Sequence, residues 1–259
     1  IFSLQNDRWI QTDKLTALDG AKYDQFGCSF AVSPGLIAVG AHYQNEGKEN
    51  AGAVYMYTLN TFGKWTLAQK LQASEIRANA YFGGRLAASD DGTLVVTAPN
   101  DNSGTGSAYV FSCTAAGVCT ETDVLRAADG EKEDNFGDSV SISYNTIIVG
   151  APYDGSDDAD YDYVDESTGS IYIYTRELEG GWVMTSKITA ADVATGAMGL
   201  GHQVANSHHT VAVVDANGLA YVKKVCDSSP TSSPMTSLPT VTPTSSPTSS
   251  PTVSPTGSP

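Results

Sequence analysis

The chain has 259 residues and carries 29 acidic against 14 basic side chains, for a net charge of −15. This balance argues against a nucleic-acid binder, which needs a basic surface for phosphates, and against docking on an anionic membrane surface. No apolar run in the sequence approaches the roughly 18 residues of a membrane-spanning helix. The length suits one sizeable hydrophobic core or two small ones.

The first quarter of the chain introduces a recurring order of short strands. A strand opened by tryptophan is predicted at 9–15, and Phe26-Gly27 follows it. A β-branched strand at 37–41 and an aromatic strand at 54–57 come next, before a second tryptophan-opened strand at 65–71. Alternating β-branched and aromatic side chains between turn residues support each strand.

The same order returns in three further copies. They begin at Phe82-Gly83, at Phe136-Gly137 and, in a weaker form, at Leu200-Gly201. The strands predicted in these copies span 95–98, 108–111, 122–126, 147–151, 171–174, 182–188, 211–214 and 220–222. A unit of about 50 residues with four short strands is typical of a propeller blade.

These motifs resemble the FG-GAP repeat, the blade unit of the integrin α-subunit N-terminal β-propeller, over most of residues 9–225. The resemblance implies an all-β fold of four-stranded antiparallel blades over residues 1–227, either a small closed ring or part of a larger propeller. If the ring closes, the strand at 9–15 completes the last blade. Each Phe should pack between neighbouring sheets, the following Gly should allow an unusual backbone, and Pro99 and Pro152 should end strands.

Acidic residues gather in two sets of predicted loops, which antiparallel pairing places on one face. Those loops hold 19 of the 29 acids and only four bases, Lys22, Lys48, Arg77 and Lys132, which predicts that this face carries the whole net charge. In integrin-like propellers this face binds ligands, so the resemblance implies an interaction surface there. The alternative is a solvated acidic surface that aids solubility.

One acidic loop, residues 154–166, is a candidate calcium site. Oxygen-bearing side chains alternate along it, at Asp154, Ser156, Asp158, Asp160 and Asp162. Calcium takes six to eight oxygen ligands, which such a loop can supply. The loop lacks the sixth-position Gly of an EF-hand, and it does not lie where integrin calcium motifs lie. The alternative is a self-repelling loop without metal.

The four cysteines indicate an oxidising environment. Cys113 and Cys119 flank a predicted turn between paired strands, which favours a disulfide. Cys28 and Cys226 lie near the two ends of the repeat array and could form a second bridge that locks the ring. The alternative for Cys28 is an ordinary buried thiol on an inner strand.

Residues 228–259 consist almost entirely of Ser, Thr and Pro and carry no charge. Such a segment cannot bury a core, so it predicts a disordered stalk of the kind that is O-glycosylated outside the cell. An ordinary cytosolic linker is the alternative. The composition favours an extracellular or cell-surface protein.

The sequence contains no nucleophile elbow, zinc-protease motif or phosphate loop, so no catalysis is expected. The favoured function is recognition or adhesion, through binding of an extracellular protein or glycan and with calcium as a candidate cofactor. Neither nucleic acid nor direct membrane insertion is expected. Two alternatives are an accessory or catalytic domain of a secreted hydrolase, because related repeats occur in a phospholipase that cleaves lipid anchors, and a structural cell-wall or coat component.

Overall fold

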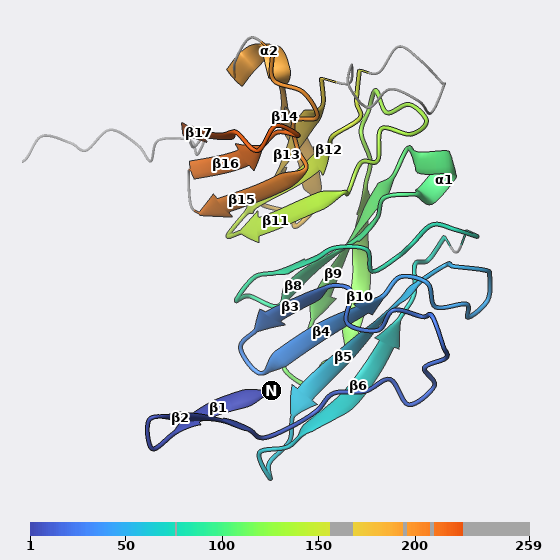
Figure 1. Ribbon diagram of the computed structural model, residues 1–259, viewed down its shortest axis with the longest axis vertical. Coiled ribbons are helices and arrows are strands. Elements are labelled where there is room, and N and C mark those ends of the chain that lie inside the picture. The colour runs from blue at the N-terminus through green and yellow to red at the C-terminus, as the bar shows by residue number, and fades with distance from the viewer. Residues whose placement is uncertain (76, 156–167, 194–195, 208–209, 225–259) are drawn as a thin grey trace, which may run out of the picture. The chain divides into compact units, whose positions relative to one another are not determined.

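The computed structural model describes residues 1–75, 77–155, 168–193, 196–207 and 210–224 (Figure 1). Residues Ile1–Cys226 form one compact unit, which ends one residue before the predicted domain boundary. The stalk predicted at 228–259 lies outside the described residues.

Four antiparallel sheets follow one another along the chain, and each corresponds to one sequence repeat. Repeat 1 contains β3 (Phe30–Ser33), β4 (Leu36–Ala41), β5 (Ala53–Leu59) and β6 (Trp65–Leu71). Repeat 2 contains β7 (Leu86–Ala88), β8 (Thr93–Ala98), β9 (Ser107–Cys113) and β10 (Cys119–Leu125). Repeat 3 contains β11 (Ser139–Ser143), β12 (Thr146–Ala151), β13 (Ser170–Arg176) and β14 (Trp182–Thr189). Repeat 4 contains β15 (Gln203–Ser207), β16 (Thr210–Val214) and β17 (Ala220–Lys224). Two helical turns, α1 (Asp101–Gly104) and α2 (Ala190–Val193), lie in loops.

The two middle strands of repeats 1 to 3 are buried on both sides. Neighbouring sheets cover them in repeats 2 and 3, and in repeat 1 Ile1, Leu15 and Ala17 cover the side that faces away from repeat 2. Phe82 shows how the signature residues contribute. Its ring lies 5.4 Å from Tyr109 of its own repeat, and it shares a core with Val54 and Met56 of repeat 1. The Phe therefore packs between neighbouring sheets, as predicted.

The Gly after Phe82, Phe136 or Leu200 permits a close approach to the preceding repeat, whereas Gly27 has no such neighbour. Gly83 has a φ of +89°, and a Cβ there would come within 2.8 Å of the Ala53 carbonyl oxygen. That conformation favours glycine, and the contact leaves no room for a side chain. The two prolines behave as expected, since Pro99 and Pro152 directly follow β8 and β12.

The prediction for the first tryptophan strand was wrong. β2 (Arg8–Gln11) pairs with β1 (Phe2–Gln5), where Trp9 lies opposite Leu4, instead of completing repeat 4. Asn6 and Asp7 between them both have positive φ, as a tight two-residue hairpin turn requires. The local turn therefore determines the partner of β2, and Trp9 is left 71% exposed.

Candidate functional site

Two sets of loops meet at one end of the sheets, here called the loop face. The first set joins β4 to β5, β8 to β9 and β12 to β13, and the second joins the last strand of one repeat to the first strand of the next. Isolated parallel bridges link them, from Gly52 to Phe82, from Gly106 to Phe136 and from Gly169 to Leu200. Each repeat thus fixes the loops of its neighbour by backbone pairing. The opposite end, with the short turns of β3–β4, β5–β6 and their counterparts, is here called the turn face.

In repeat 1, a lysine on the last strand holds the loop face together. Lys70 Nζ lies 2.5 Å from Asp19 Oδ2 and also donates to Glu46. The Tyr55 hydroxyl donates to Asp19 Oδ1 at 2.8 Å. The hydrogen bond from Lys70 lowers the pKa of Asp19, and, although burial opposes it, the two carboxylates raise the pKa of Lys70. Asp19 and Lys70 are therefore both charged at neutral pH.

Repeat 3 builds a similar cluster, with its lysine, tyrosine and first aspartate at equivalent positions and Asp154 at the position of Gln44 in repeat 1. Lys187 Nζ lies 2.7 Å from Asp129 Oδ2 and 2.6 Å from Asp154 Oδ2. The Tyr172 hydroxyl donates to Asp129 at 3.0 Å and lies 3.3 Å from Asp154 Oδ2. Lys187 lowers the pKa of Asp129, while burial raises the pKa of Tyr172. The ammonium group of Lys187 therefore joins the loop between β10 and β11 to the loop that follows β12.

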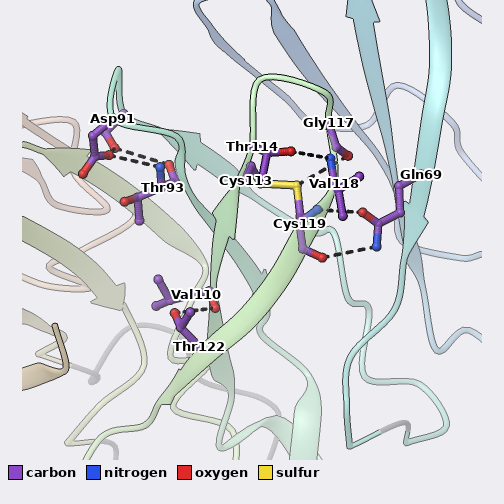
Figure 2. Close-up of a disulfide and its surroundings, with 11 residues drawn as sticks. Gln69, Asp91, Thr93, Val110, Cys113, Thr114, Gly117, Val118, Cys119 and Thr122 are labelled. Atoms are coloured by element: carbon purple, nitrogen blue, oxygen red, sulfur yellow. Dashed lines mark hydrogen bonds between the residues drawn. A yellow bond between two sulfur atoms is a disulfide. The ribbon is translucent and has the colours of Figure 1, made fainter.

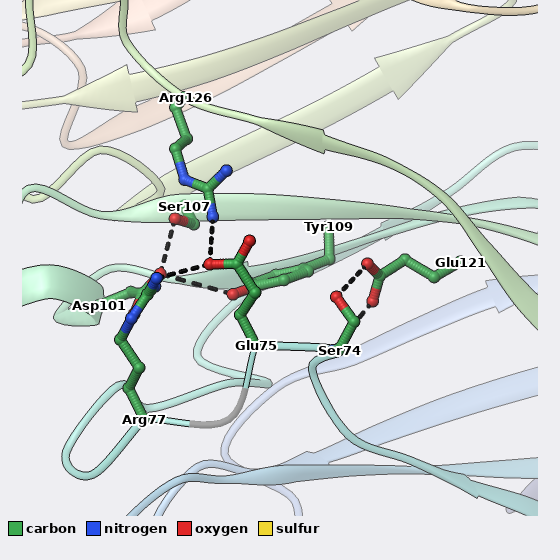
Figure 3. Close-up of polar contacts among 8 residues, drawn as sticks. All are labelled: Ser74, Glu75, Arg77, Asp101, Ser107, Tyr109, Glu121 and Arg126. Atoms are coloured by element: carbon green, nitrogen blue, oxygen red, sulfur yellow. Dashed lines mark hydrogen bonds and ion pairs between the residues drawn. The ribbon is translucent and has the colours of Figure 1, made fainter.

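Repeat 2 replaces the lysine with an arginine from a loop (Figure 3). Asp101, in α1, is fully buried, and Arg77 Nη1 lies 2.7 Å from both of its carboxylate oxygens. The Ser107 hydroxyl donates to Asp101 Oδ2 at 2.8 Å, and the Tyr109 hydroxyl donates to the same oxygen at 3.4 Å. Together these hydrogen bonds offset the free-energy cost of burying the Asp101 carboxylate.

Further contacts connect the loop between β6 and β7 to β10 and to the residue that follows it. Glu75 Oε2 accepts from Arg77 at 2.5 Å and from Arg126 at 3.0 Å. The Ser74 hydroxyl and backbone N–H donate to the two carboxylate oxygens of Glu121, at 2.5 and 3.1 Å (Figure 3). The loop face of repeats 1 and 2 is therefore joined by side chains as well as by backbone.

These contacts correct the charge count made from the sequence. The count assigned four bases to the loop face, but among the described residues Lys70, Lys187 and Arg126 also reach its carboxylates. They were missed because strand residues were taken to lie away from the loops, whereas a long side chain at a strand end extends to the rim. The face keeps an excess of acid, but it does not carry the whole net charge alone.

Asp134 is a buried acid beside the repeat 3 cluster. It is 3% exposed, and its Oδ2 accepts from the Glu131 backbone N–H at 2.7 Å. Burial, opposed by that hydrogen bond and reinforced by the charge of Asp154, raises the pKa of Asp134 to about 6. Sequence reasoning counted Asp134 as a loop acid and did not separate it from its exposed neighbours.

The candidate calcium set is described only in part. Asp154 is buried, and Lys187 and Tyr172 already contact its carboxylate. Ser156, Asp158, Asp160 and Asp162 lie outside the described residues. In the part of the chain that the structure describes, no three His, Cys, Asp or Glu side chains are grouped to hold a metal ion. The calcium site stays a prediction about residues 156–162.

A row of polar side chains crosses three repeats at the loop-face ends of their first strands. Arg85 Nη2 and His202 Nδ1 both lie 3.6 Å from Asp138 carboxylate oxygens. The Tyr153 ring packs edge-on against His202 at 5.8 Å. Burial and the charge of Arg85 lower the pKa of His42, whose Nδ1 is buried without a partner among the described residues. Asp138 and His202 each directly follow the Phe-Gly or Leu-Gly of their repeat, and this shared position could have identified them from the sequence.

One disulfide lies away from this site, at the turn face (Figure 2). Cys113 and Cys119 form the disulfide that their spacing predicts, and it closes the β9–β10 hairpin at the turn face. The Gln69 side chain of repeat 1 accepts from the Cys119 N–H at 2.7 Å and donates to its carbonyl at 3.2 Å. Cys28 has a free, exposed thiol that precedes β3, and Cys226 lies outside the described residues. The prediction of a buried Cys28 on an inner strand was therefore wrong.

Comparison with known proteins identifies the repeats. Residues 9–57, 65–111 and 119–174 match the family described as FG-GAP repeat. No curated protein sequence matches the chain. None of the helices in the described ranges is long and apolar enough to cross a membrane.

One solved structure shares the fold at low sequence identity, and two others align more weakly. A computationally designed protein, Ika4, aligns over 83% of this chain and all of its own, with a TM-score of 0.51 and 14% identity. A Lactobacillus plantarum protein (TM-score 0.41, 15% identity) aligns over 74% of this chain and 54% of its own. Sqt1 from Chaetomium thermophilum (TM-score 0.44, 12% identity) aligns over 78% and 44%. The chain thus spans about half the length of the last two.

Proposed function

The chain belongs to the FG-GAP repeat family, and on this premise we propose that it is an extracellular recognition module that binds a basic partner protein through its loop face. FG-GAP repeats are characteristic of extracellular proteins and typically serve as protein-interaction modules. A disulfide at Cys113–Cys119 suits that location. The proposal is one of binding without catalysis.

The observation that carries the proposal is the fixed arrangement of acids at the loop face. Lys70, Arg77 and Lys187 each hold carboxylates from two different loops. The loops are therefore positioned before a partner arrives, which lowers the ordering cost of binding. Glu49 and Glu131 are exposed at this face and add to its negative potential. Such a surface attracts a basic partner, and the affinity for that partner falls as the salt concentration rises.

Calcium is a further part of the proposal. A cation bound by the oxygen-bearing side chains of residues 156–162 would reduce the repulsion among the carboxylates of that stretch. Calcium affinity of the purified chain tests this part directly, by titration calorimetry on the wild type and on the double variant Asp158→Ala plus Asp160→Ala. The proposal requires a large loss of affinity in the variant. Unchanged affinity would remove these residues as ligands.

The partner is sought by a pull-down from cell-surface and matrix extract, with the full chain as bait, in calcium and in chelator. Glu49→Lys plus Glu131→Lys reverses charge on the loop face, and the matched control Glu177→Lys plus Glu179→Lys makes the same change at exposed positions on the turn face. The proposal predicts a partner that is retained by the control and lost by the loop-face variant. Equal retention by both variants would contradict it, and binding that is insensitive to salt would favour an uncharged glycan.

A further inference from the structure

The three interfaces between successive repeats are built in the same way. The forward face of a repeat is here the side of its two middle strands that packs against the next repeat, and the backward face is the opposite side of the same sheet. At each interface, a forward face packs against the backward face of the next repeat. Forward-face side chains in repeats 1 to 3 are buried, and they are Ala38, Val54 and Met56, then Val95, Ala108 and Val110, then Ile148, Ile171 and Ile173. Each set contacts the Phe or Leu of the following repeat, together with its own apolar strand residues.

The backward face of repeat 1 has no preceding sheet against it among the described residues. Ile1, Leu15 and Ala17 of the N-terminal segment pack on its middle strands and leave β3 uncovered. Phe30 and Val32 of β3 are 72% and 61% exposed. The residues that pair identically in the next two repeats, Leu86 and Ala88 in repeat 2 and Val140 and Ile142 in repeat 3, pack into the cores between repeats. A groove of about 680 Å³ lies at this face, lined chiefly by apolar side chains that include Phe2, Phe26, Phe30, Val32, Ile37 and Val39.

The forward face of repeat 4 is uncovered in the complementary way. Ala212, Ala220 and Val222 occupy the positions of the buried forward-face residues of repeats 1 to 3. Ala220 and Val222 are nonetheless exposed, Val222 at 70%. One chain therefore presents both halves of an interface that it forms three times internally.

From this complementarity we propose that a second copy of this chain occupies the groove, with its repeat 4 packed against the first copy's repeat 1. The occupant is a copy because the groove continues an interface already used between repeats. The contact is head-to-tail, so each chain retains one further face, and two chains either close into a ring or continue into a filament. Apolar surfaces exposed in this way mark interaction sites.

Salt separates this contact from binding at the loop face. Chains of net charge −15 repel one another, and the proposed contact is apolar. Screening should therefore strengthen self-association, whereas it weakens binding of a basic partner. Either proposal can fail without the other.

Sedimentation velocity of the full chain tests the proposal, with two variants that each damage one half of the contact. Phe30→Glu places a charge in the groove and Val222→Glu places one on the forward face. Leu178→Glu is the matched control, since Leu178 is fully exposed at the β13–β14 turn. Wild type and control should associate at tens of micromolar, more strongly at higher salt. Each of the other variants should weaken association at least about tenfold, because an apolar contact is lost to a buried charge.

A mixture of the two variants gives the sharpest result. Phe30→Glu chains keep an intact forward face and Val222→Glu chains keep an intact groove, so the mixture should form a one-to-one heterodimer that neither variant forms alone. A contact in which Phe30 packs on Phe30 of the second copy, and Val222 on Val222, would not be restored by mixing. Monomeric wild type at every salt concentration, loss of association in the control, or no heterodimer in the mixture would overturn the proposal. Far-ultraviolet circular dichroism checks that all variants are folded.

Discussion

At the loop face, Lys70, Arg77 and Lys187 bind carboxylates and thereby connect the long segments between strands. At the turn face, short turns and one disulfide close the sheets, and Arg176 pairs with Asp91 across repeats at 2.9 Å. The turn face needs little beyond its turns because its connections are short. The loop face needs charged side chains to fix its long connections, and the same charges are available to a partner. The proposed binding function therefore lies at the face whose loops are stabilised by electrostatic contacts.

The largest effect is expected at Asp101. Replacement by Ala leaves Arg77, Ser107 and Tyr109 without their shared acceptor, so the free energy of unfolding should fall by about 3 kcal/mol. Denaturant unfolding at pH 7 measures it. The control Asp90→Ala, at an exposed turn-face position, should cost less than about 0.5 kcal/mol. Equal costs for the two variants would show that the loop face does not depend on its buried carboxylate.

Removal of the disulfide tests how much the turn face contributes to the free energy of unfolding. Cys113→Ser plus Cys119→Ser removes a cross-link around a short loop, and the unfolding free energy should fall by about 2 kcal/mol. Cys28→Ser serves as the control and should change stability little, because that thiol is free and exposed. A loss larger than that of Asp101→Ala would reverse the ranking of the two faces.

Lys187→Met tests the lysine cluster of repeat 3. It leaves Asp129 and Asp154 facing each other without a cation, and the expected cost is about 1–2 kcal/mol at pH 7, after allowing for the half-exposed Asp129. Lys187 lowers the pKa of Asp129, so its stabilisation is present above the unfolded-state pKa and is lost as the pH falls through the lowered one. The difference from wild type should therefore shrink below about pH 4. The exposed loop lysine variant Lys132→Met should show neither effect.

The smallest effect has the opposite sign. The pKa of Asp134 is raised to about 6, so this group contributes stability below its unfolded-state pKa and loses that contribution as the pH rises through 6. Asp134→Asn keeps the acceptor for the Glu131 N–H and removes the buried charge. The variant should be about 1 kcal/mol more stable than wild type at pH 7.5, and the gain should disappear near pH 4. Thermal unfolding across that pH range would show it, and a pH-independent difference would exclude titration of Asp134 as the cause.

The sequence predicted most strands because alternation and turn residues are local signals. The predicted strand 65–71 matches β6 in full, and 37–41 omits only the first residue of β4. The partner of β2 was missed because a strand pattern does not say which edge it pairs with, and the Asn6-Asp7 turn supplies a nearer one.

At the site, sequence counting found the acids but not what holds them. Lys70 and Lys187 recur before an apolar residue at the end of equivalent strands, but only the fold shows that both reach the loop face. Burial separates Asp134 and Asp101 from their exposed neighbours, and no local pattern reports burial of a loop residue. The acidic run after Asp154 could be predicted, whereas the contacts of Asp154 with Lys187 and Tyr172 depend on tertiary structure.

The most direct test of the recognition proposal is the association rate constant of the chain with the partner isolated by pull-down, measured between 50 and 500 mM salt. An acidic loop face that steers a basic partner predicts a fall in that rate constant of about tenfold or more, with little change in the dissociation rate constant. The loop-face variant Glu49→Lys plus Glu131→Lys should start from a lower rate and show a weaker salt dependence, while Glu177→Lys plus Glu179→Lys should follow the wild type. A rate constant that is independent of salt, or equally affected by both variants, would contradict the account.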